Sequence, residues 1–131
     1  MAVRRCRSNQ SGSEVELSCP VGAALELARL IAQGRVTGLA LDAPSSGAEP
    51  YDRWLDQIQV ACSDESGVVV SAVGNVLRIV GPMEGLALLA RNIEALAQEP
   101  RSHGHLHLGF FEGHPFLIAG STDLVVYILS S

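Results

Sequence analysis

A chain of 131 residues, of which 47% are hydrophobic and 18% charged, has the length and composition of one folded domain, which excludes a disordered protein. Its formal net charge is −5, and setting aside three arginines near the N-terminus leaves −8, because removing +3 from −5 gives −8. Nucleic-acid binding is therefore disfavoured, since it requires a basic face, and no apolar stretch approaches the roughly 20 residues that a membrane helix needs.

The N-terminal segment differs from the rest of the chain in charge and polarity. Residues 1–13 contain Arg4, Arg5, Arg7 and a polar, serine-rich run, which predicts a disordered basic tail before a single domain over 14–131. No apolar segment follows the arginines, as one would in a secretory signal. The three cysteines are widely spaced and form no C-x-x-C pair, which favours a cytoplasmic protein.

The first half of the domain begins with a short strand and a helix. Residues 14–18 alternate polar and apolar side chains, as a half-buried strand does. Pro20 suits the start of a helix, and the apolar positions of residues 21–33 fall on one helical face. Two further strands are predicted over 36–41 and 55–62, separated by a turn-rich loop.

The second half follows a similar order. Residues 68–80 predict a hairpin with a tight Gly-Asn turn. A Gly-Pro pair then begins an amphipathic helix over 82–98, and two strands are predicted over 105–110 and 124–129.

The two helices can be superimposed at an offset of 62 residues, which places Pro20 on Pro82 and Leu27 on Leu89. Two interpretations stay open. The chain contains two similar strand–helix–strand–strand units, with halves at 14–63 and 67–131, or any two helices begun by proline look alike.

Each helix has one apolar stripe, and the strands are rich in β-branched residues. The economical architecture is an α+β two-layer sandwich, in which both helices pack on one face of a mostly antiparallel or mixed sheet. The opposite face of that sheet must then be solvated, covered by a loop or used for binding.

All four histidines lie near the C-terminus, three of them in a predicted strand. Side chains alternate in a strand. One face should therefore carry His103, His105 and His107, and the other Leu106, Leu108 and Phe110. The apolar side chains should enter the core, so the imidazoles should line the open face.

This histidine cluster has two interpretations. Imidazoles two residues apart on a strand can converge on zinc, and catalytic zinc needs three protein ligands and an open position. The candidate metal ligands are His103, His105, His107, Glu112 and His114. The alternative is that histidines are tolerated on a solvated face and hold no metal. No P-loop, dinucleotide fingerprint or G-x-S-x-G elbow is present, which favours a binding protein over an enzyme.

The C-terminal half carries an ordered series of motifs: a strand ending in glycine, a short apolar helix, the His-Leu-His-Leu strand at 105–108, and a Gly-Ser turn into a final apolar strand. Over about residues 56–131 this series resembles the immunity protein 32 family of bacterial polymorphic toxin systems. The resemblance implies a non-catalytic α+β protein that binds and neutralises a cognate toxin in the cytoplasm. The H-x-H motif of the family corresponds to His105 and His107 in this chain, and the resemblance implies no particular role for them.

Acidic residues gather between Asp42 and Glu65, with Tyr51 and Trp54 among them. Complementary charge speeds encounter with a basic partner, and aromatics rimmed by charge are typical interface anchors. Alternatively, Trp54 covers an edge of the core and the acids are merely solvated. The candidate binding residues are Tyr51, Asp52, Trp54, Asp56, His105, His107, Glu112 and His114.

A homodimer is a third hypothesis. If the last strand lies at a sheet edge, it could pair with its copy in a second chain through Val125, Val126 and Ile128.

Overall fold

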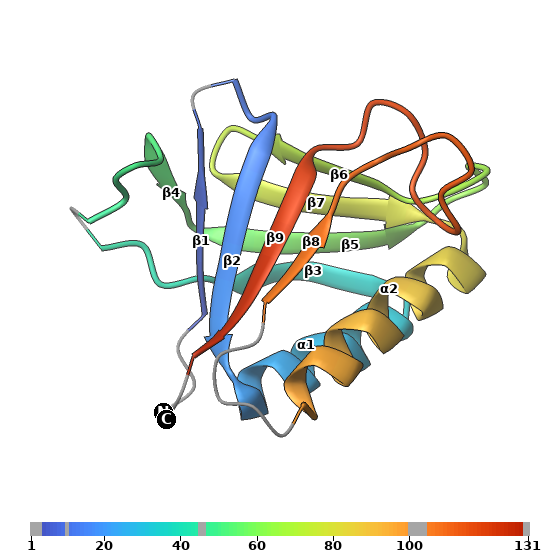
Figure 1. Cartoon of the computed structure of the whole chain (residues 1–131), viewed down its shortest axis with the longest axis horizontal. Coiled ribbons are helices and arrows are strands. Elements are labelled where there is room, and N and C mark those ends of the chain that lie inside the picture. The colour runs from blue at the N-terminus through green and yellow to red at the C-terminus, as the bar shows by residue number, and fades with distance from the viewer. Residues whose placement is uncertain (1–3, 10, 45–46, 100–104, 130–131) are drawn as a thin grey trace.

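A computed structural model of the chain describes residues 4–9, 11–44, 47–99 and 105–129 (Figure 1). The elements are, in order, β1 (Arg5–Ser8), β2 (Glu14–Pro20), α1 (Val21–Ala32), β3 (Arg35–Ala40), β4 (Arg53–Leu55), β5 (Gln57–Cys62), β6 (Val69–Val73), β7 (Val76–Gly81), α2 (Met83–Ala97), β8 (His105–Leu108) and β9 (Asp123–Leu129). The predicted helices and strands are confirmed to within two residues at their ends, except that the strand expected over 55–62 is divided at Asp56.

The strands form two sheets, and in Figure 1 the strands β1, β2, β9 and β8 run across those of the second sheet behind them. Sheet A has the order β4-β1-β2-β9-β8, and sheet B the order β3-β5-β7-β6. Each sheet contains one parallel pair, β2 with β9 and β5 with β7, and its other neighbours are antiparallel. The predicted α+β sandwich with two helices and mixed pairing is confirmed, but two sheets replace the single sheet that we expected.

Each helix carries the chain from one sheet to the other. β2 of sheet A leads through Pro20 into α1, which is followed by β3 of sheet B. β7 of sheet B leads through Pro82 into α2, and the next strand is β8 of sheet A. The two prolines have φ values of −67° and −69°, so each strand runs into its helix without a loop. Apart from the short β4, the order strand–helix–strand–strand thus occurs twice.

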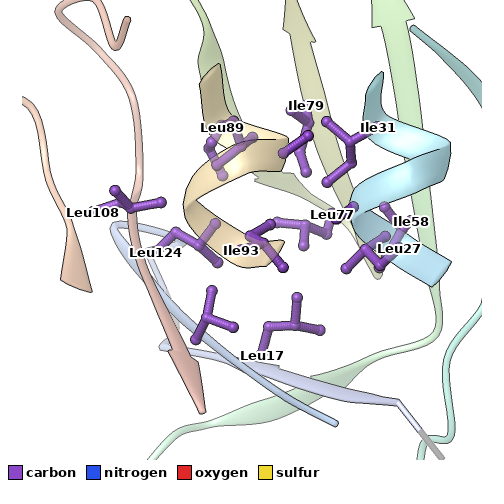
Figure 2. Close-up of a cluster of buried hydrophobic side chains, with 14 of the residues drawn as sticks. Leu17, Leu27, Ile31, Ile58, Leu77, Ile79, Leu89, Ile93, Leu108 and Leu124 are labelled. Carbon is purple, nitrogen blue, oxygen red and sulfur yellow. The ribbon is translucent and has the colours of Figure 1, made fainter. Parts of the chain in front are cut away.

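One hydrophobic core fills the space between the two sheets and the helix pair, as Figure 2 shows. Its central side chains come from both sheets and both helices and are at most 1% exposed: Leu17, Leu27, Ile58, Leu77, Ile93 and Leu124. The apolar stripe of each helix and one face of each sheet are therefore buried together, as the periodicity predicted.

The disordered tail predicted over residues 1–13 is wrong for β1, which pairs with β2 on one side and β4 on the other. Cys6 and Ser8 are fully buried, while Arg5 and Arg7 point away from the core. The arginines suggested a solvated segment. They occupy alternate positions of a strand, however, so both project from the outer side of the sheet while the opposite face is covered.

The edge position suggested for the last strand is also wrong, because β9 lies between β2 and β8. Val126 pairs with Leu17 on one side and Leu106 on the other, and both Val126 and Ile128 are buried. β9 therefore has no free edge through which it could pair with its copy in a second chain. The parallel pairing of β2 with β9 joins opposite ends of the chain, which strand periodicity cannot reveal.

Candidate binding face

The histidine strand has the predicted alternation. In β8, His105 and His107 are exposed, whereas Leu108 is buried and Leu106 packs against the core. His105 stacks on Tyr127 of β9, with ring centroids 5.3 Å apart, and His107 Nε2 lies 3.5 Å from a carboxylate oxygen of Asp123. The imidazoles thus lie outside the core, on the surface of sheet A.

The strand register of sheet A brings distant parts of the sequence into rows on this surface. Trp54 of β4 is opposite Arg7 of β1, which is opposite Glu16 of β2. The row continues through Val125 of β9 to His107 of β8. We call this surface the outer face of sheet A. It comprises the outward side chains of the five strands: Arg5, Arg7, Glu14, Glu16, Ser18, Trp54, His105, His107, Asp123, Val125, Tyr127 and Leu129.

Arg7 organises one side of the outer face of sheet A. Its Nε and Nη2 lie 2.9 and 2.7 Å from one carboxylate oxygen of Glu16. Its Nη1 donates to the backbone carbonyls of Ala48 and Glu49, at 3.1 and 2.7 Å. The guanidinium also lies over the ring of Tyr51, 4.8 Å from its centroid. One cation therefore holds the loop before β4 against the sheet.

Tyr51, a predicted binding residue, has a role within this network. Its hydroxyl donates a hydrogen bond of 3.0 Å to Glu14 on β2. Burial and, secondly, this hydrogen bond to a carboxylate raise the pKa of Tyr51 to about 12. Tyr51 is thus a neutral donor that fixes its loop to the sheet, and only part of its ring is exposed.

The other predicted residues of this region flank or form β4. Trp54 is half-buried on the outer face of sheet A, because its neighbour Leu55 points into the core. Asp52 is exposed, and its backbone N–H continues the pairing with β1 by donating to Ser8. Asp56 is exposed where the chain passes from sheet A to sheet B. Trp54 and the histidines therefore share one face, whereas Asp56 marks its border.

Glu112 and His114 lie in the loop between β8 and β9, whereas His105 and His107 lie in β8 itself. His114 Nδ1 accepts hydrogen bonds from the backbone N–H groups of Phe116 and Leu117, at 3.1 and 2.9 Å. Burial lowers the pKa of His114 and so favours the neutral ring that can accept these bonds. Glu112 is exposed.

The zinc alternative gains no support from this arrangement. Within residues 4–9, 11–44, 47–99 and 105–129, no three His, Cys, Asp or Glu side chains are grouped as metal ligands. His103, the remaining candidate, lies outside the described residues.

Two features of the surface were missed. Arg5 and Arg7 lie in a strand, which the alternation of Arg-Cys-Arg-Ser indicates, and not in a disordered tail. Phe110 is expected in the core, but it is 41% exposed, because β8 ends at Leu108 and strand alternation does not extend to it. A side chain at Gly109 would meet the carboxylate of Asp123 at 2.9 Å, so the backbone that follows β8 packs closely against the start of β9.

The fold and the outer face of sheet A define a two-helix α+β protein with a mixed aromatic and charged surface on one sheet. Residues 76–128 match the family model of Immunity protein 32. This segment contains β7, α2, β8 and nearly all of β9, and the match confirms the resemblance predicted from the C-terminal motifs. Comparison with curated proteins and with solved structures gives no match. In the described part of the chain, neither helix has the length and apolarity that crossing a membrane requires.

Proposed function

We propose that this protein is a cytoplasmic, non-catalytic immunity protein that binds a cognate toxin through the outer face of sheet A. The observation that carries the proposal is the family match over residues 76–128. The matched segment supplies β8 and β9, and hence His105, His107 and Tyr127 on that face.

The chemistry of the outer face of sheet A suits a protein partner. Trp54 and Tyr127 offer partly exposed aromatic rings, and Arg7 is held in place by four polar contacts. Tryptophan, tyrosine and arginine dominate the energetics of protein interfaces, above all when they are already ordered before binding. With a net charge of −5, the chain also favours encounter with a basic protein.

The direct test is protection of growing cells. The polypeptide encoded immediately upstream of this gene is induced in a bacterial host, with and without the protein. We expect growth arrest without the protein and restored growth with it. Continued arrest in the presence of the folded protein would contradict the proposal.

The proposal requires no metal. Zinc added to tag-free protein should therefore leave its melting temperature unchanged, whereas a bound metal stabilises the folded state by mass action. A rise in melting temperature, together with about one zinc per chain in elemental analysis, would favour the metal-site alternative.

A further inference from the structure

Two adjacent aromatic rings project from the loop between β8 and β9. Phe110 is 41% exposed and Phe111 58% exposed, whereas Phe116, the third phenylalanine of the chain, is only 7% exposed. Single exposed apolar side chains are common in soluble proteins, whereas contiguous exposed apolar patches often mark binding sites.

The loop is held in one conformation by its own contacts. The His114 ring lies between Phe111 and Phe116, with centroid distances of 4.8 and 4.7 Å. The His114 backbone N–H donates to the Phe111 carbonyl at 2.9 Å, while Nδ1 accepts from Phe116 and Leu117. The exposed ring of Phe111 is thus connected through His114 to buried residues.

The base of the loop is joined to sheet B. The N–H of Val68 donates to the Phe116 carbonyl at 2.6 Å, and the N–H of Ile118 donates to the Val68 carbonyl at 3.2 Å. Leu117 is 2% exposed and forms a bridge with Val68. Because the loop is already ordered, binding through its tip would not carry the entropic cost of fixing it.

Charge favours a protein over a membrane as the target of these rings. Residues 105–129 contain no lysine or arginine, and Glu112 is adjacent to Phe111. Attachment to anionic lipid usually requires basic residues beside the apolar ones. The loop also connects β8 directly to β9, the two strands that place His105, His107 and Tyr127 on the outer face of sheet A.

We propose that Phe110 and Phe111 are the apolar anchor of the toxin interface and insert into an apolar pocket of the toxin. This inference rests on the proposed function and adds the kind of surface that the partner must provide.

The test compares the affinity of variants for the upstream-encoded polypeptide. The double variant Phe110→Ser/Phe111→Ser should bind at least about 30-fold more weakly, as loss of an interface hot spot does. The variant Phe111→Leu should retain most of the affinity. Val73→Ala changes another apolar residue, 56% exposed on β6, and should bind like the wild type. The melting temperature of the double variant should fall only slightly, because both rings are largely exposed and only the contact of Phe111 with His114 is lost.

The outcomes separate this inference from the proposed function. If the wild type protects cells and the double variant binds equally well, the anchor is wrong and the immunity function stands. If the wild type neither protects nor binds, both fall together. A dimer in light scattering that the double variant abolishes would assign the rings to a second copy instead. Wild-type binding to phosphatidylcholine vesicles that the double variant loses would assign them to a membrane, and either result overturns the anchor.

Discussion

At the residue scale, the Arg7 side chain stabilises the fold through its bonds to Glu16 and to the carbonyls of Ala48 and Glu49. Its side chain is 20% exposed and its partner Glu16 15% exposed, so the pair is partly shielded from water. By contrast, the neighbouring pair of Arg5 with Asp42 is 44% and 52% exposed. Exposed pairs contribute little to stability, whereas charge-assisted bonds in a shielded network contribute more.

We therefore expect Arg7→Lys to lower the free energy of unfolding by about 1–3 kcal/mol, because lysine cannot reproduce the planar set of donors to Glu16 and two carbonyls. The matched change Arg5→Lys should cost less than about 1 kcal/mol. Urea unfolding of both variants measures the difference. Equal losses would show that the Arg7 network does not stabilise the fold.

His114 provides a prediction about pH. Its folded-state pKa is lowered by burial from the ordinary value of 6.5, so the unfolded chain binds the proton more readily. The stability that His114 contributes is therefore complete above pH 6.5 and is lost as the pH falls through the lower folded-state pKa.

We expect wild-type stability to fall more steeply than that of His114→Asn between about pH 7.5 and about pH 5. The asparagine side-chain oxygen can accept the same two N–H groups without titrating in this range. Urea unfolding at several pH values checks the expectation. Parallel pH profiles for the two proteins would contradict it.

At the scale of elements, β9 shows how one strand serves both the core and the surface. Its side chains alternate between the core and the outer face of sheet A along Asp123–Leu129. Leu124 is 1% exposed, whereas Tyr127 is 39% exposed. Substitutions at neighbouring positions should therefore have different consequences.

We expect Leu124→Ala to lower the free energy of unfolding by about 2–5 kcal/mol, because it leaves a cavity in the core. Tyr127→Ala should cost less than about 1 kcal/mol and should weaken toxin binding instead. Urea unfolding and an affinity measurement on both variants separate the two effects. A large loss of stability in Tyr127→Ala would show that this face is part of the folding core.

At the scale of the whole molecule, the two strand–helix–strand–strand units are interlocked. Each unit contributes strands to both sheets, and the parallel pairs β2–β9 and β5–β7 join one unit to the other. Neither unit can bury its helix stripe alone, because each helix packs mainly against the helix of the other unit. The molecule should therefore unfold as one cooperative unit.

This cooperativity is measurable through Trp54, the only tryptophan, which lies in β4 of sheet A. Its fluorescence and the far-ultraviolet circular dichroism should give the same unfolding midpoint in urea. Two separate midpoints, or a stable fold in an isolated fragment of residues 67–131, would contradict the interlocked arrangement.

Much of the local structure could be predicted from the sequence. The helix stripes, the Gly-Asn hairpin and the outward histidines of β8 all follow from periodicity over a few residues. The strand β1 is hard to predict from the sequence, because the periodicity of four residues is a weaker signal than the two arginines among them. Phe110 is not on the buried face because β8 ends at Leu108, and the alternation of strand side chains does not continue beyond it.

The candidate site was only partly predictable for the same reason. Trp54 and His107 were both identified, but as members of separate regions about fifty residues apart, and only the register of sheet A places them in one row. Tyr51 was predicted as an interface anchor, yet its contacts with Glu14 and Arg7 required β1 and β2 to be adjacent to its loop.

The amino-acid sequence alone determined the elements, their buried faces and the family resemblance of the C-terminal half, because these depend on residue order over short distances. The tertiary structure decided that there are two sheets, that β9 is an interior strand, and which side chains share the outer face of sheet A. Those properties depend on pairing between distant strands. Such pairing is stabilised by the shared core, and that core is built from side chains of segments that are distant in the sequence.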